Sequence, residues 1–306
     1  MNVVVLPTYN ERDNVRHAVA RIREVAEGHG VRLYTLIVDD ASPDGTGEIA
    51  DDLAATVPDV SVLHRAGKEG LGRAYIAGFR TALEMGAERI FEMDADLSHD
   101  ATYLPHFLRL IDQGADLVLG SRYVKGGGVE NWSLPRKVIS RGGCLYAQLV
   151  LGLPYRDLTG GFKCFRRRVL ETIDLDAIDT KGYGFQIEMT YRAHQLGFRI
   201  VELPIVFVDR KVGESKMTND IVLEAMKNVW KLRFSPPARA GRPACGDRRD
   251  TPGRRTARRL RRRAGAGRGG AGGAGGGRPP PPPAAAPAAA PAPPPPPPPA
   301  PPPPPP

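Results

Sequence analysis

The sequence predicts an α/β protein with a mainly parallel sheet and helices on both faces, followed by a tail that forms no core. Short apolar runs rich in β-branched residues alternate with longer segments whose apolar residues recur every three or four positions. This is the pattern of strands alternating with helices. The composition then changes sharply near Ser235. We therefore expect a globular domain over residues 1–235 and a low-complexity, disordered tail over residues 236–306.

The first half of the chain contains five short apolar runs that predict buried strands. They occupy residues 2–6, 33–38, 60–63, 90–93 and 115–119. The segments between them place apolar residues on one helical face. These segments carry, in order, Val15 with Val19, Ile49 with Leu53, Ile76 with Phe79, and the range 103–111. Asn10 is the predicted N-cap of the first helix, because an Asn side chain accepts from free backbone amides at a helix start.

The second half predicts a different mixture of elements. In chain order we expect an unusually apolar helix over residues 138–151, a turn and strand within 157–165, a helix over 186–196 and a strand over 200–207. A basic loop, 209–217, precedes a last helix over 218–234. That helix combines Trp230 and Phe234 with lysines and an arginine, which suits either a membrane interface or ordinary core packing.

The positive charge of the chain is concentrated in its tail. Residues 236–306 contain 13 Arg, no Lys and 2 Asp, a net charge of +11, whereas the whole chain carries +9. Residues 1–235 are therefore close to neutral, at about −2. The tail cannot bury enough apolar surface to fold. Its arginine block suits nucleic acid or acidic lipid, but an extension without function is the favoured interpretation, and no nucleic-acid partner is expected.

Cysteine content and the apolar runs restrict the class of protein further. Three cysteines in scattered positions argue against a disulfide framework and against a zinc site built from Cys and His. The first residues lack the basic and long apolar regions of a signal peptide. No apolar run reaches the roughly 18 residues needed to cross a bilayer. We therefore expect a cytoplasmic protein that is soluble or peripheral to a membrane.

The stretch Asp94-Ala95-Asp96 directly follows the apolar run at 90–93. In an extended chain its two carboxylates would project on the same side, at the kind of strand end where open α/β sheets bind ligands. Mg²⁺ and Mn²⁺ prefer such oxygen ligands and commonly bridge carboxylates to a diphosphate. Taken alone, the motif also fits a solvated turn with two ordinary aspartates.

Further polar motifs stand at the ends of the other predicted strands. They are Tyr9 and Glu11, Asp39 and Asp40, Lys68, and Arg122. Because the carboxyl ends of parallel strands lie along one edge of a sheet, this recurrence predicts a ligand crevice at that edge. The recurrence therefore favours a binding site over a solvated turn for Asp94-Ala95-Asp96.

Six motifs in a fixed order resemble those of a known family. They are Pro7-Thr8-Tyr9-Asn10-Glu11, Asp39-Asp40-Ala41-Ser42-Pro43-Asp44-Gly45, Lys68-Glu69-Gly70-Leu71-Gly72, Asp94-Ala95-Asp96-Leu97-Ser98-His99, Gly120-Ser121-Arg122-Tyr123, and Asp209-Arg210 with Gly213-Glu214-Ser215-Lys216-Met217. Over about residues 1–233 the chain resembles the polyprenol (dolichol) phosphate mannosyltransferases. These are family 2 glycosyltransferases with the nucleotide-diphospho-sugar transferase (GT-A type) fold.

The resemblance implies two binding sites and a metal ion. The residues implied to bind the nucleotide sugar, GDP-mannose, are Pro7, Tyr9, Glu11, Asp39, Asp40, Lys68, Asp94, Ala95 and Asp96. Those implied to bind the phosphate of polyprenyl or dolichyl phosphate are Arg122, Arg136, Ser140, Arg210 and Lys216, and guanidinium groups suit this because they bind phosphate through paired hydrogen bonds. Mg²⁺ or Mn²⁺ would be held by Asp94 and Asp96, with Ser98 standing where some relatives carry Gln as a further ligand. The implied catalytic residues are Asp94, Asp96, Arg122 and Arg210.

The reaction that the resemblance implies is a single displacement with inversion, which gives a β-mannosyl phosphate lipid. A phosphate monoester is already largely ionised at neutral pH, so it attacks the sugar without a general base. Consistent with this, residues 182–188 lack the Glu-Asp pair that many relatives with hydroxyl acceptors carry. We therefore expect catalysis to consist chiefly of positioning and charge neutralisation.

A lipid acceptor implies work at a membrane. We expect a peripheral protein on the cytoplasmic face, in contact through the helix after residue 138, the loop 209–217 and the last helix. A membrane-embedded partner protein is left open. Two alternative functions also stand beside this one: glucosyl transfer from UDP-glucose by the same fold, and a non-catalytic nucleotide- or RNA-binding protein that acts through its basic tail.

Overall fold

The computed structural model describes residues 1–178, 180, 182–208 and 219–234, and of residues 219–225 only the backbone. The chain divides into two units, Met1–Arg248 and Arg249–Pro306, and every described residue belongs to the first unit. The domain boundary predicted near Ser235 lies outside the described residues. That boundary and the expected disorder of the tail therefore stay predictions.

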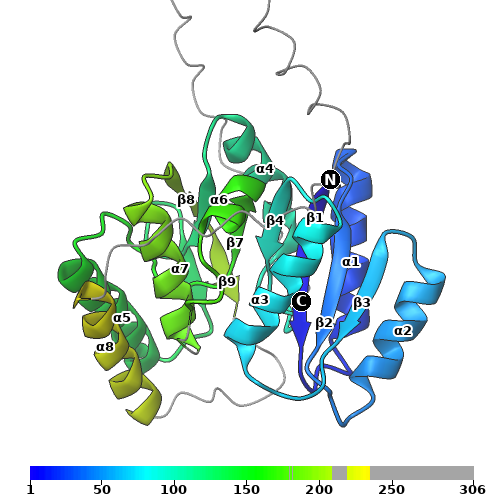
Figure 1. The fold of residues 1–306 in the computed structure, drawn as a ribbon, viewed down its shortest axis with the longest axis horizontal. Helices are drawn as coiled ribbons and strands as arrows, with labels where there is room; N and C mark the ends of the chain where they lie inside the picture. The colour runs from blue at the N-terminus through cyan, green and yellow to red at the C-terminus, as the bar shows by residue number, and fades with distance from the viewer. Residues whose placement is uncertain (179, 181, 209–218, 235–306) are drawn as a thin grey trace, which may run out of the picture. The chain divides into compact units, whose positions relative to one another are not determined.

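A seven-stranded sheet forms the centre of the described part of the chain (Figure 1). Its strands in spatial order are β3 (Val60–His64), β2 (Tyr34–Asp39), β1 (Asn2–Thr8), β4 (Arg89–Glu92), β7 (Lys163–Arg166), β5 (Leu117–Ser121) and β8 (Ile200–Pro204). Neighbouring strands run parallel except where β7 pairs with β4 and β5. The prediction of a mainly parallel sheet is confirmed.

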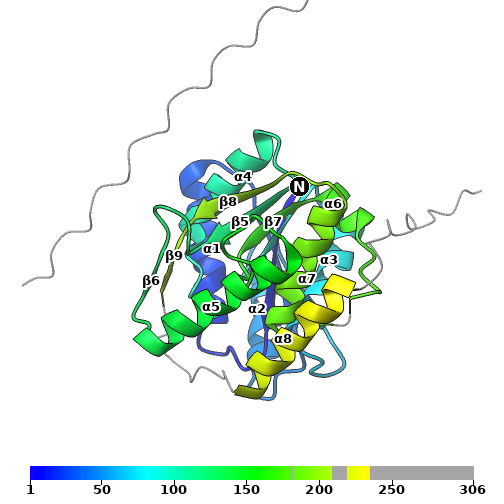
Figure 2. The ribbon, with the colours of Figure 1, turned by 90° about the vertical axis from the view of Figure 1, so that its left-hand side faces the viewer.

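Helices cover both faces of this sheet (Figures 1 and 2). One face carries α1 (Val15–His29), α2 (Thr46–Thr56) and α4 (Leu104–Asp112), the last preceded by the short 3-10 helix η1 (Ala101–Tyr103). The other face carries α3 (Leu71–Glu84), α6 (Arg167–Thr172) and α7 (Tyr183–Gln195). The remaining helices, α5 (Leu134–Leu151) and α8 (Asn219–Phe234), pack against α7 and against each other.

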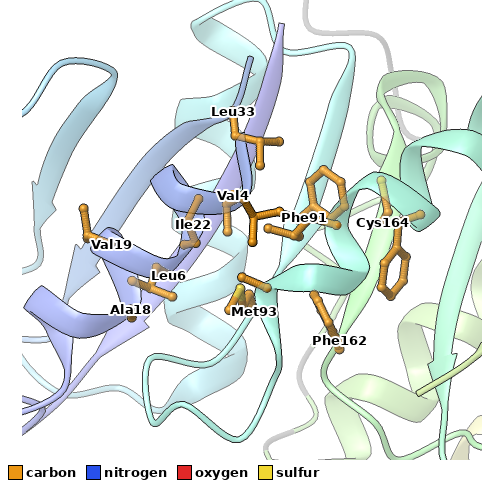
Figure 3. Packing of buried hydrophobic residues seen from close by; sticks show 14 of the residues in the cluster. Val4, Leu6, Ala18, Val19, Ile22, Leu33, Phe91, Met93, Phe162 and Cys164 are labelled. Atoms are coloured by element: carbon orange, nitrogen blue, oxygen red, sulfur yellow. The ribbon is translucent and has the colours of Figure 1, made fainter. Parts of the chain in front are cut away.

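The side chains of β1 show how the sequence creates two cores. Val3 and Val5 belong to the core under α3, whereas Val4 and Leu6 belong to the core under α1, because successive side chains of a strand point to opposite faces. Both faces are covered, so all four residues are apolar, as is typical of a buried parallel strand. Figure 3 shows the core under α1 with residues from β1, α1 and β4, among them Val4, Leu6, Ala18, Ile22 and Phe91.

A third apolar cluster joins α5, α7 and α8. Its buried members are Ala147, Leu151, Leu153, Leu158, Ile187, Tyr191, Val229 and Leu232. Figure 2 shows α5 and α8 side by side on this flank, and the Tyr146 hydroxyl donates to the Met226 carbonyl at 3.2 Å between them. Among the described residues, every helix is too short or too polar to traverse a bilayer.

Two predicted helix boundaries are wrong. Asn10 does not cap the first helix: it has a left-handed φ of 59°, and Asn14 occupies the N-cap position of α1. The segment after Tyr9 first makes a turn, with Val15 N donating to Glu11 O at 2.9 Å. In the second half, α5 begins at Leu134 rather than near 138, with a proline in its first turn, where the fixed φ of proline favours helix.

The predicted single strand over residues 200–207 is also wrong. The chain leaves the main sheet after β8, where Ile205 N donates to Ser121 O at 3.0 Å and Gly128 N donates to Ile205 O at 3.0 Å. A separate strand, β9 (Val206–Val208), follows and pairs in parallel with β6 (Gly128–Glu130). In this small second sheet, β6 is a strand that the sequence did not predict, whereas β9 overlaps the end of the predicted strand over residues 200–207. The sheet places Phe207 beside Arg122, which follows the end of β5.

Candidate active site

The carboxyl ends of β1, β2 and β4 open onto a cavity of about 290 Å³. The cavity is lined by Pro7, Thr8, Tyr9, Glu11, Asp40, Lys68, Gly70, Leu71, Ala74, Asp94, Ala95 and Asp96. These residues come from the end of β1, from the segments that follow β1 to β4, and from the first turn of α3. Eight of the nine residues predicted to bind a nucleotide sugar therefore lie together, and Asp39 is the exception.

The segments after β1 and β2 are held to each other by hydrogen bonds. Three amides of the first donate to side chains of the second: Asn10 N to Ser42 Oγ at 3.1 Å, Glu11 N to Thr46 Oγ1 at 3.0 Å, and Arg12 N to Asp44 Oδ2 at 3.2 Å. Burial alone would raise the pKa of Asp44, but the hydrogen bonds from Thr46 and Arg12 lower it below its ordinary value. The second segment thus fixes the backbone that carries Tyr9 and Glu11.

The adjacent carboxylates of Asp39 and Asp40 have different surroundings. Asp39 turns inward and accepts from Thr8 Oγ1 at 3.1 Å and from Ser42 Oγ at 2.6 Å. These bonds tie the end of β1 to the segment after β2. Asp40 lines the cavity and forms an ion pair with Arg65. Of the two, Asp40 lies at the cavity, and Asp39 supports the loop.

Lys68 lies over the ring of Tyr9, with its Nζ 3.6 Å from the ring centroid. A cation at this distance is attracted by the negative face of an aromatic ring. Both residues line the cavity. The cavity therefore offers a ring and a positive charge side by side, which suits an aromatic base that carries phosphate groups.

Asp94 and Asp96 lie in a turn after β4 rather than in the strand itself. β4 ends at Glu92, and Leu97 has a left-handed φ of 62°. The expectation that extended backbone would align the two carboxylates is therefore wrong. The turn nevertheless places Asp94 and Asp96 at the same cavity.

Neighbouring side chains hold this turn in place. The Tyr75 hydroxyl donates to Asp94 Oδ1 at 2.8 Å. Burial and the nearby carboxylates raise the pKa of Tyr75 well above its ordinary value, so the phenol keeps its proton. Asp94 N donates to His99 Nδ1 at 3.1 Å, and the His99 ring stacks on Phe162 with 4.9 Å between centroids. His99 is thus a structural support of the turn.

Ser98 is directed at Asp96. Its backbone N donates to Asp96 Oδ1 at 3.0 Å, and its hydroxyl donates to the same oxygen. The hydroxyl therefore orients a carboxylate in this structure. In the part of the chain that the structure describes, no three His, Cys, Asp or Glu side chains gather as a metal cluster. The two carboxylates fit Mg²⁺ or Mn²⁺ of the kind that is held by one or two carboxylates together with substrate phosphates and water.

A second group of predicted residues surrounds Arg122, which follows the end of β5. Its guanidinium is buried and pairs with Asp157, with Nε 2.7 Å from Oδ2 and Nη2 2.7 Å from Oδ1. The guanidinium carbon lies 5.3 to 5.6 Å from the ring centroids of Tyr123, Trp132 and Phe207. The predicted phosphate-binding arginine is therefore enclosed by one carboxylate and three rings.

Arg136 and Ser140 of α5 adjoin this group. The guanidinium carbon of Arg136 is 4.2 Å from the ring centroid of Trp132. The Tyr123 hydroxyl donates to Ser140 Oγ at 2.7 Å. Three of the five residues predicted to bind the lipid phosphate are thus brought together by α5 and the end of β5.

The Arg122 group and the Asp94 turn adjoin each other. The ring of Phe207 lies 5.5 Å from the rings of both His99 and Trp132, and His99 is bonded to the turn. Gly161 lies beside the turn, and a Cβ added to it would be in van der Waals contact with Asp94 Oδ2, at 3.6 Å. The two groups therefore form neighbouring parts of one site.

Some residues of the site were missed by the sequence analysis. They are Tyr75 and Asp157 with the hydrogen bonds above, the aromatic residues Trp132 and Phe207, and the cavity-lining Thr8, Gly70, Leu71 and Ala74. Tyr75 and Asp157 carry no local signal, because their partners are 19 and 35 residues away in the chain. Arg210 and Lys216 lie outside the described residues, so their predicted roles stay predictions.

The fold and the cavity together define a class of protein. A mainly parallel α/β sheet with a carboxylate-bearing cavity at the carboxyl ends of its first strands is typical of nucleotide-sugar transferases of the GT-A type. Residues 3–174 match the family model described as glycosyl transferase family 2, and the chain belongs to this family. The prediction of a sugar-transferring enzyme is thereby confirmed.

Relatives and solved structures agree with this assignment. An undecaprenyl-phosphate mannosyltransferase from Micrococcus luteus is 52% identical over 232 residues, 75% of this chain and 93% of the relative. A polyprenol monophosphomannose synthase from Mycolicibacterium smegmatis is 47% identical over 234 residues, 76% of this chain and 87% of the relative. Two structures of glucosyl-3-phosphoglycerate synthase from Mycobacterium tuberculosis share the fold. The complex with phosphoglyceric acid has a TM-score of 0.57 at 16% identity, covering 77% of this chain and 81% of that chain. The complex with Mn²⁺, UDP-glucose and phosphoglyceric acid has a TM-score of 0.56 at 17% identity. This match covers 77% of this chain and 80% of that chain.

Proposed function

We propose that this chain transfers mannose from GDP-mannose to a polyprenyl (dolichyl-type) monophosphate, with inversion at the transferred carbon and with Mg²⁺ or Mn²⁺ bound. The observation that carries the proposal is the gathering of Tyr9, Lys68, Asp94 and Asp96 at one cavity. Arg122, which follows β5, and Arg136 of α5 lie beside it. Two relatives named for mannosyl transfer to polyprenyl phosphates, at 52% and 47% identity, support the choice of sugar and acceptor.

The donor half of the proposal rests on the cavity. Tyr9 and Lys68 offer a ring and an ammonium to a purine nucleotide. Asp40, held by Arg65, offers a carboxylate to the amine of the base or to the ribose hydroxyls. These groups would bind GDP-mannose through stacking, charge and hydrogen bonds, with the sugar directed toward the Asp94 turn.

The metal part of the proposal rests on the two carboxylates. Asp94 and Asp96 would hold the ion, which when bound supplies positive charge to the diphosphate leaving group. Tyr75 orients Asp94 and Ser98 orients Asp96 through the hydrogen bonds described above. The carboxylates are therefore preorganised by neighbouring side chains, which is how proteins fix metal ligands and lower the cost of reorganisation.

The acceptor half rests on the basic and aromatic group around α5. Arg122 and Arg136 would bind the phosphate monoester, and Ser140 would add a hydroxyl. The phosphate is largely ionised at neutral pH, so it needs no general base, and the protein's work is to hold its oxygen in line with the anomeric carbon. The adjacent Asp94 turn suits that arrangement.

Transfer of labelled mannose to a polyprenyl phosphate in detergent, with divalent ion omitted and restored, tests the proposal. Asp96→Asn is expected to lower transfer by about a hundredfold or more, because it removes a charged oxygen ligand of the diphosphate-bound ion. Asp52→Asn is the matched control, since Asp52 is an exposed carboxylate of α2 paired with Arg16, and it should retain full activity. Full activity of Asp96→Asn, or undiminished transfer in excess chelator, would contradict the proposed site.

Glucosyl transfer from UDP-glucose is the second candidate function. It is favoured only by the shared fold with a structure that contains UDP-glucose and Mn²⁺. Parallel assays with GDP-mannose and UDP-glucose separate the two candidates. We expect GDP-mannose to be preferred, and faster transfer from UDP-glucose would replace mannose in the proposal. Deleting residues 236–306 tests the non-catalytic alternative, which predicts loss of function where we expect none.

We also propose a peripheral position on the cytoplasmic face of a membrane. The exposed side of α5 carries four apolar side chains at helical spacing, Leu134, Val138, Leu145 and Leu149, each more than half exposed. They lie opposite the buried Cys144, Ala147 and Leu151, because residues three, four or seven apart share a helix face. Trp230 and Phe234 of the neighbouring α8 are also exposed. An apolar stripe beside the proposed lipid-phosphate residues suits a protein that reaches its acceptor at a bilayer surface.

A further inference from the structure

We propose that Asp157 is a positioning residue for the transfer reaction: it holds the Arg122 guanidinium so that one terminal nitrogen, Nη1, is presented to the acceptor phosphate. The inference rests on the proposed function, because it takes the ligand of Arg122 to be a phosphate monoester. It adds a residue that lies in none of the six motifs on which the resemblance is based.

The hydrogen bonds of the pair determine which nitrogen remains for a ligand. Asp157 Oδ2 accepts from Arg122 Nε at 2.7 Å and from Arg122 N at 3.0 Å, while Oδ1 accepts from Nη2 at 2.7 Å. Thr159 Oγ1 accepts the second hydrogen of Nη2 at 2.9 Å. Within the described part of the chain, no hydrogen bond involves Nη1. The donors of Nη1 are thus the ones left for a phosphate oxygen, and guanidinium groups bind phosphate through such N–H donors.

The surroundings keep this guanidinium charged and in one place. The Arg122 and Asp157 side chains are 6% and 0% exposed, and the rings of Tyr123, Trp132 and Phe207 line the guanidinium. Burial opposes the charge on Arg122, but the Asp157 carboxylate raises its pKa above the ordinary value. Burial likewise opposes the charge on Asp157, but Arg122 lowers the pKa of Asp157. A fixed buried charge that keeps one nitrogen out of its protein hydrogen bonds costs little reorganisation when a charged ligand binds.

Asp157 is itself fixed by the sheet. Glu202 of β8 accepts from the backbone N of Asp157 and of Arg156 at 3.0 Å, so the start of this loop is tied to the edge strand. The same loop then passes the Asp94 turn, where an added Cβ on Gly160 would lie 3.6 Å from Asp157 Oδ1 and one on Gly161 would lie 3.6 Å from Asp94 Oδ2. The loop from Asp157 to Gly161 therefore connects the position of the phosphate-binding arginine to the position of the metal-binding turn.

The test compares Asp157→Asn with the full-length wild type, using a short-chain polyprenyl phosphate and GDP-mannose. Asn keeps the shape but turns one acceptor oxygen into an NH₂ group that repels the guanidinium. We expect the KM for the lipid phosphate to rise by about tenfold to a hundredfold, since small misplacements of a positioning group have effects of this size. The KM for GDP-mannose and the equilibrium affinity for GDP should stay within about twofold.

Asp116→Asn is the matched control for lost stability. Asp116 is also buried, accepts from Arg168 Nε at 2.8 Å and from Arg199 N at 3.1 Å, and precedes β5 at the end opposite to Arg122. It should lower the midpoint of thermal unfolding without changing either KM. Thr159→Val is the milder second variant, because it removes only one bond to Nη2, and we expect it to raise the KM for the lipid phosphate by a few fold in a folded protein.

A double-variant experiment shows whether Asp157 acts through Arg122. In an Arg122→Lys background, which removes the forked contact, Asp157→Asn should add less than about twofold to the KM for the lipid phosphate, because directly coupled residues are not additive. The inference is overturned if Asp157→Asn and Thr159→Val leave the KM for the lipid phosphate unchanged, or if they raise the KM of both substrates equally. It is also overturned if the effects of Arg122→Lys and Asp157→Asn on the KM for the lipid phosphate multiply in the double variant. Absence of mannosyl transfer to polyprenyl phosphate by the wild type would instead overturn the proposed function.

Discussion

Glu92 and Lys163 lie directly opposite each other on the antiparallel strands β4 and β7, and both side chains are fully buried under the Asp94 turn. Lys163 Nζ donates to the backbone and side-chain oxygens of Gln186 at 2.8 and 2.6 Å. Neither Glu92 oxygen has a hydrogen bond of good geometry among the described residues, although the Gln186 side chain lies near enough to favour the charged form. Burial raises the pKa of Glu92 from 4.5 to about 7, with the Lys163 charge opposing the rise. Burial lowers the pKa of Lys163 from 10.5 to about 8, with the Glu92 charge opposing the fall.

These shifts predict how the free energy of unfolding depends on pH. Between pH 4.5 and 7 the folded state keeps the Glu92 proton that the unfolded state has lost, so Glu92 makes the free energy of unfolding fall as pH rises through this window. Between about pH 8 and 10.5 the unfolded state keeps the Lys163 proton that the folded state has lost. Lys163 therefore makes the free energy of unfolding rise with pH in this window. Denaturant titration in the presence of chelator should therefore show that Glu92 lowers the free energy of unfolding by on the order of 3 kcal/mol between pH 4.5 and 8. Glu92→Gln should remove that slope, and an unchanged slope would contradict the assignment.

The sequence motifs identified the side chains that reach the candidate site better than the side chains that hold them. Tyr9, Lys68, Asp94 and Asp96 stand in the segments that follow predicted strands and do line one cavity. Tyr75 and Asp157 could not be found in this way, because a hydrogen bond across 19 or 35 residues depends on how helices and loops pack. Asp39 illustrates the converse: its position after a strand suggested a ligand contact, but its carboxylate bonds to Thr8 and Ser42.

At the scale of single elements, α3 has an unusually close approach to the sheet. A Cβ added to Gly78 would lie 2.3 Å from Val5 Cγ1 and 3.0 Å from Val38 Cγ2. Helix propensity alone makes alanine better than glycine in a helix interior by about 1 kcal/mol. Here overpacking against β1 and β2 opposes and exceeds that gain, because an extra methyl in a well-packed core costs about 1–3 kcal/mol.

We therefore predict opposite effects of the same substitution in two helices. Gly78→Ala should lower the free energy of unfolding by up to about 2 kcal/mol, the difference between the two terms above. Gly142→Ala in α5 should raise it by about 0.5–1 kcal/mol, because nothing lies within 4 Å of the added Cβ and the helix gains propensity. Denaturant titration of both variants measures the two signs. A stabilised Gly78→Ala protein would contradict the close packing of α3 on the sheet.

Element boundaries were predictable where one local rule dominated. The buried strands β1 to β5 follow from short β-branched runs, and their helices follow from apolar spacing. The break between β8 and β9 was missed, although Pro204 ends β8 and proline is typical of strand ends and edge strands. It is determined by Ile205, which bonds to the end of β5 and to Gly128. The start of α5 was predicted near residue 138 rather than at Leu134, although Pro135 was a signal for the earlier start, because proline is favoured in a first helical turn.

At the scale of the whole molecule, alternation of strands and helices predicted a mainly parallel sheet, and this is confirmed. The order of strands was beyond the sequence, because β7 enters between β4 and β5 in the antiparallel direction. That insertion has a consequence for the site. It places the loop with Asp157 and Gly161 between the strand that precedes Asp94 and the strand that precedes Arg122, so the proposed donor and acceptor groups become neighbours.

The whole molecule also carries the prediction of membrane contact. The exposed apolar stripe of α5 has basic neighbours in Lys137 and Arg141 on exposed positions, so both the hydrophobic effect and attraction to acidic headgroups would favour a bilayer surface. Co-sedimentation of the full chain with vesicles of acidic phospholipid should therefore recover the protein in the pellet. We expect weaker recovery with neutral vesicles and at high salt.

Substitution on the stripe separates apolar contact from charge. The double variant Leu145→Ser and Leu149→Ser should weaken vesicle binding by about tenfold, because partly buried leucine side chains each contribute on the order of 1 kcal/mol at an interface. Leu145→Met with Leu149→Met keeps the apolar character and is the matched control, so it should bind as the wild type does. Both variants should keep transfer to a short-chain acceptor in detergent, where no bilayer is needed. Equal vesicle binding by the serine variant would place the membrane contact elsewhere than α5, and a wild type that stays in the supernatant with acidic vesicles would overturn the peripheral position itself.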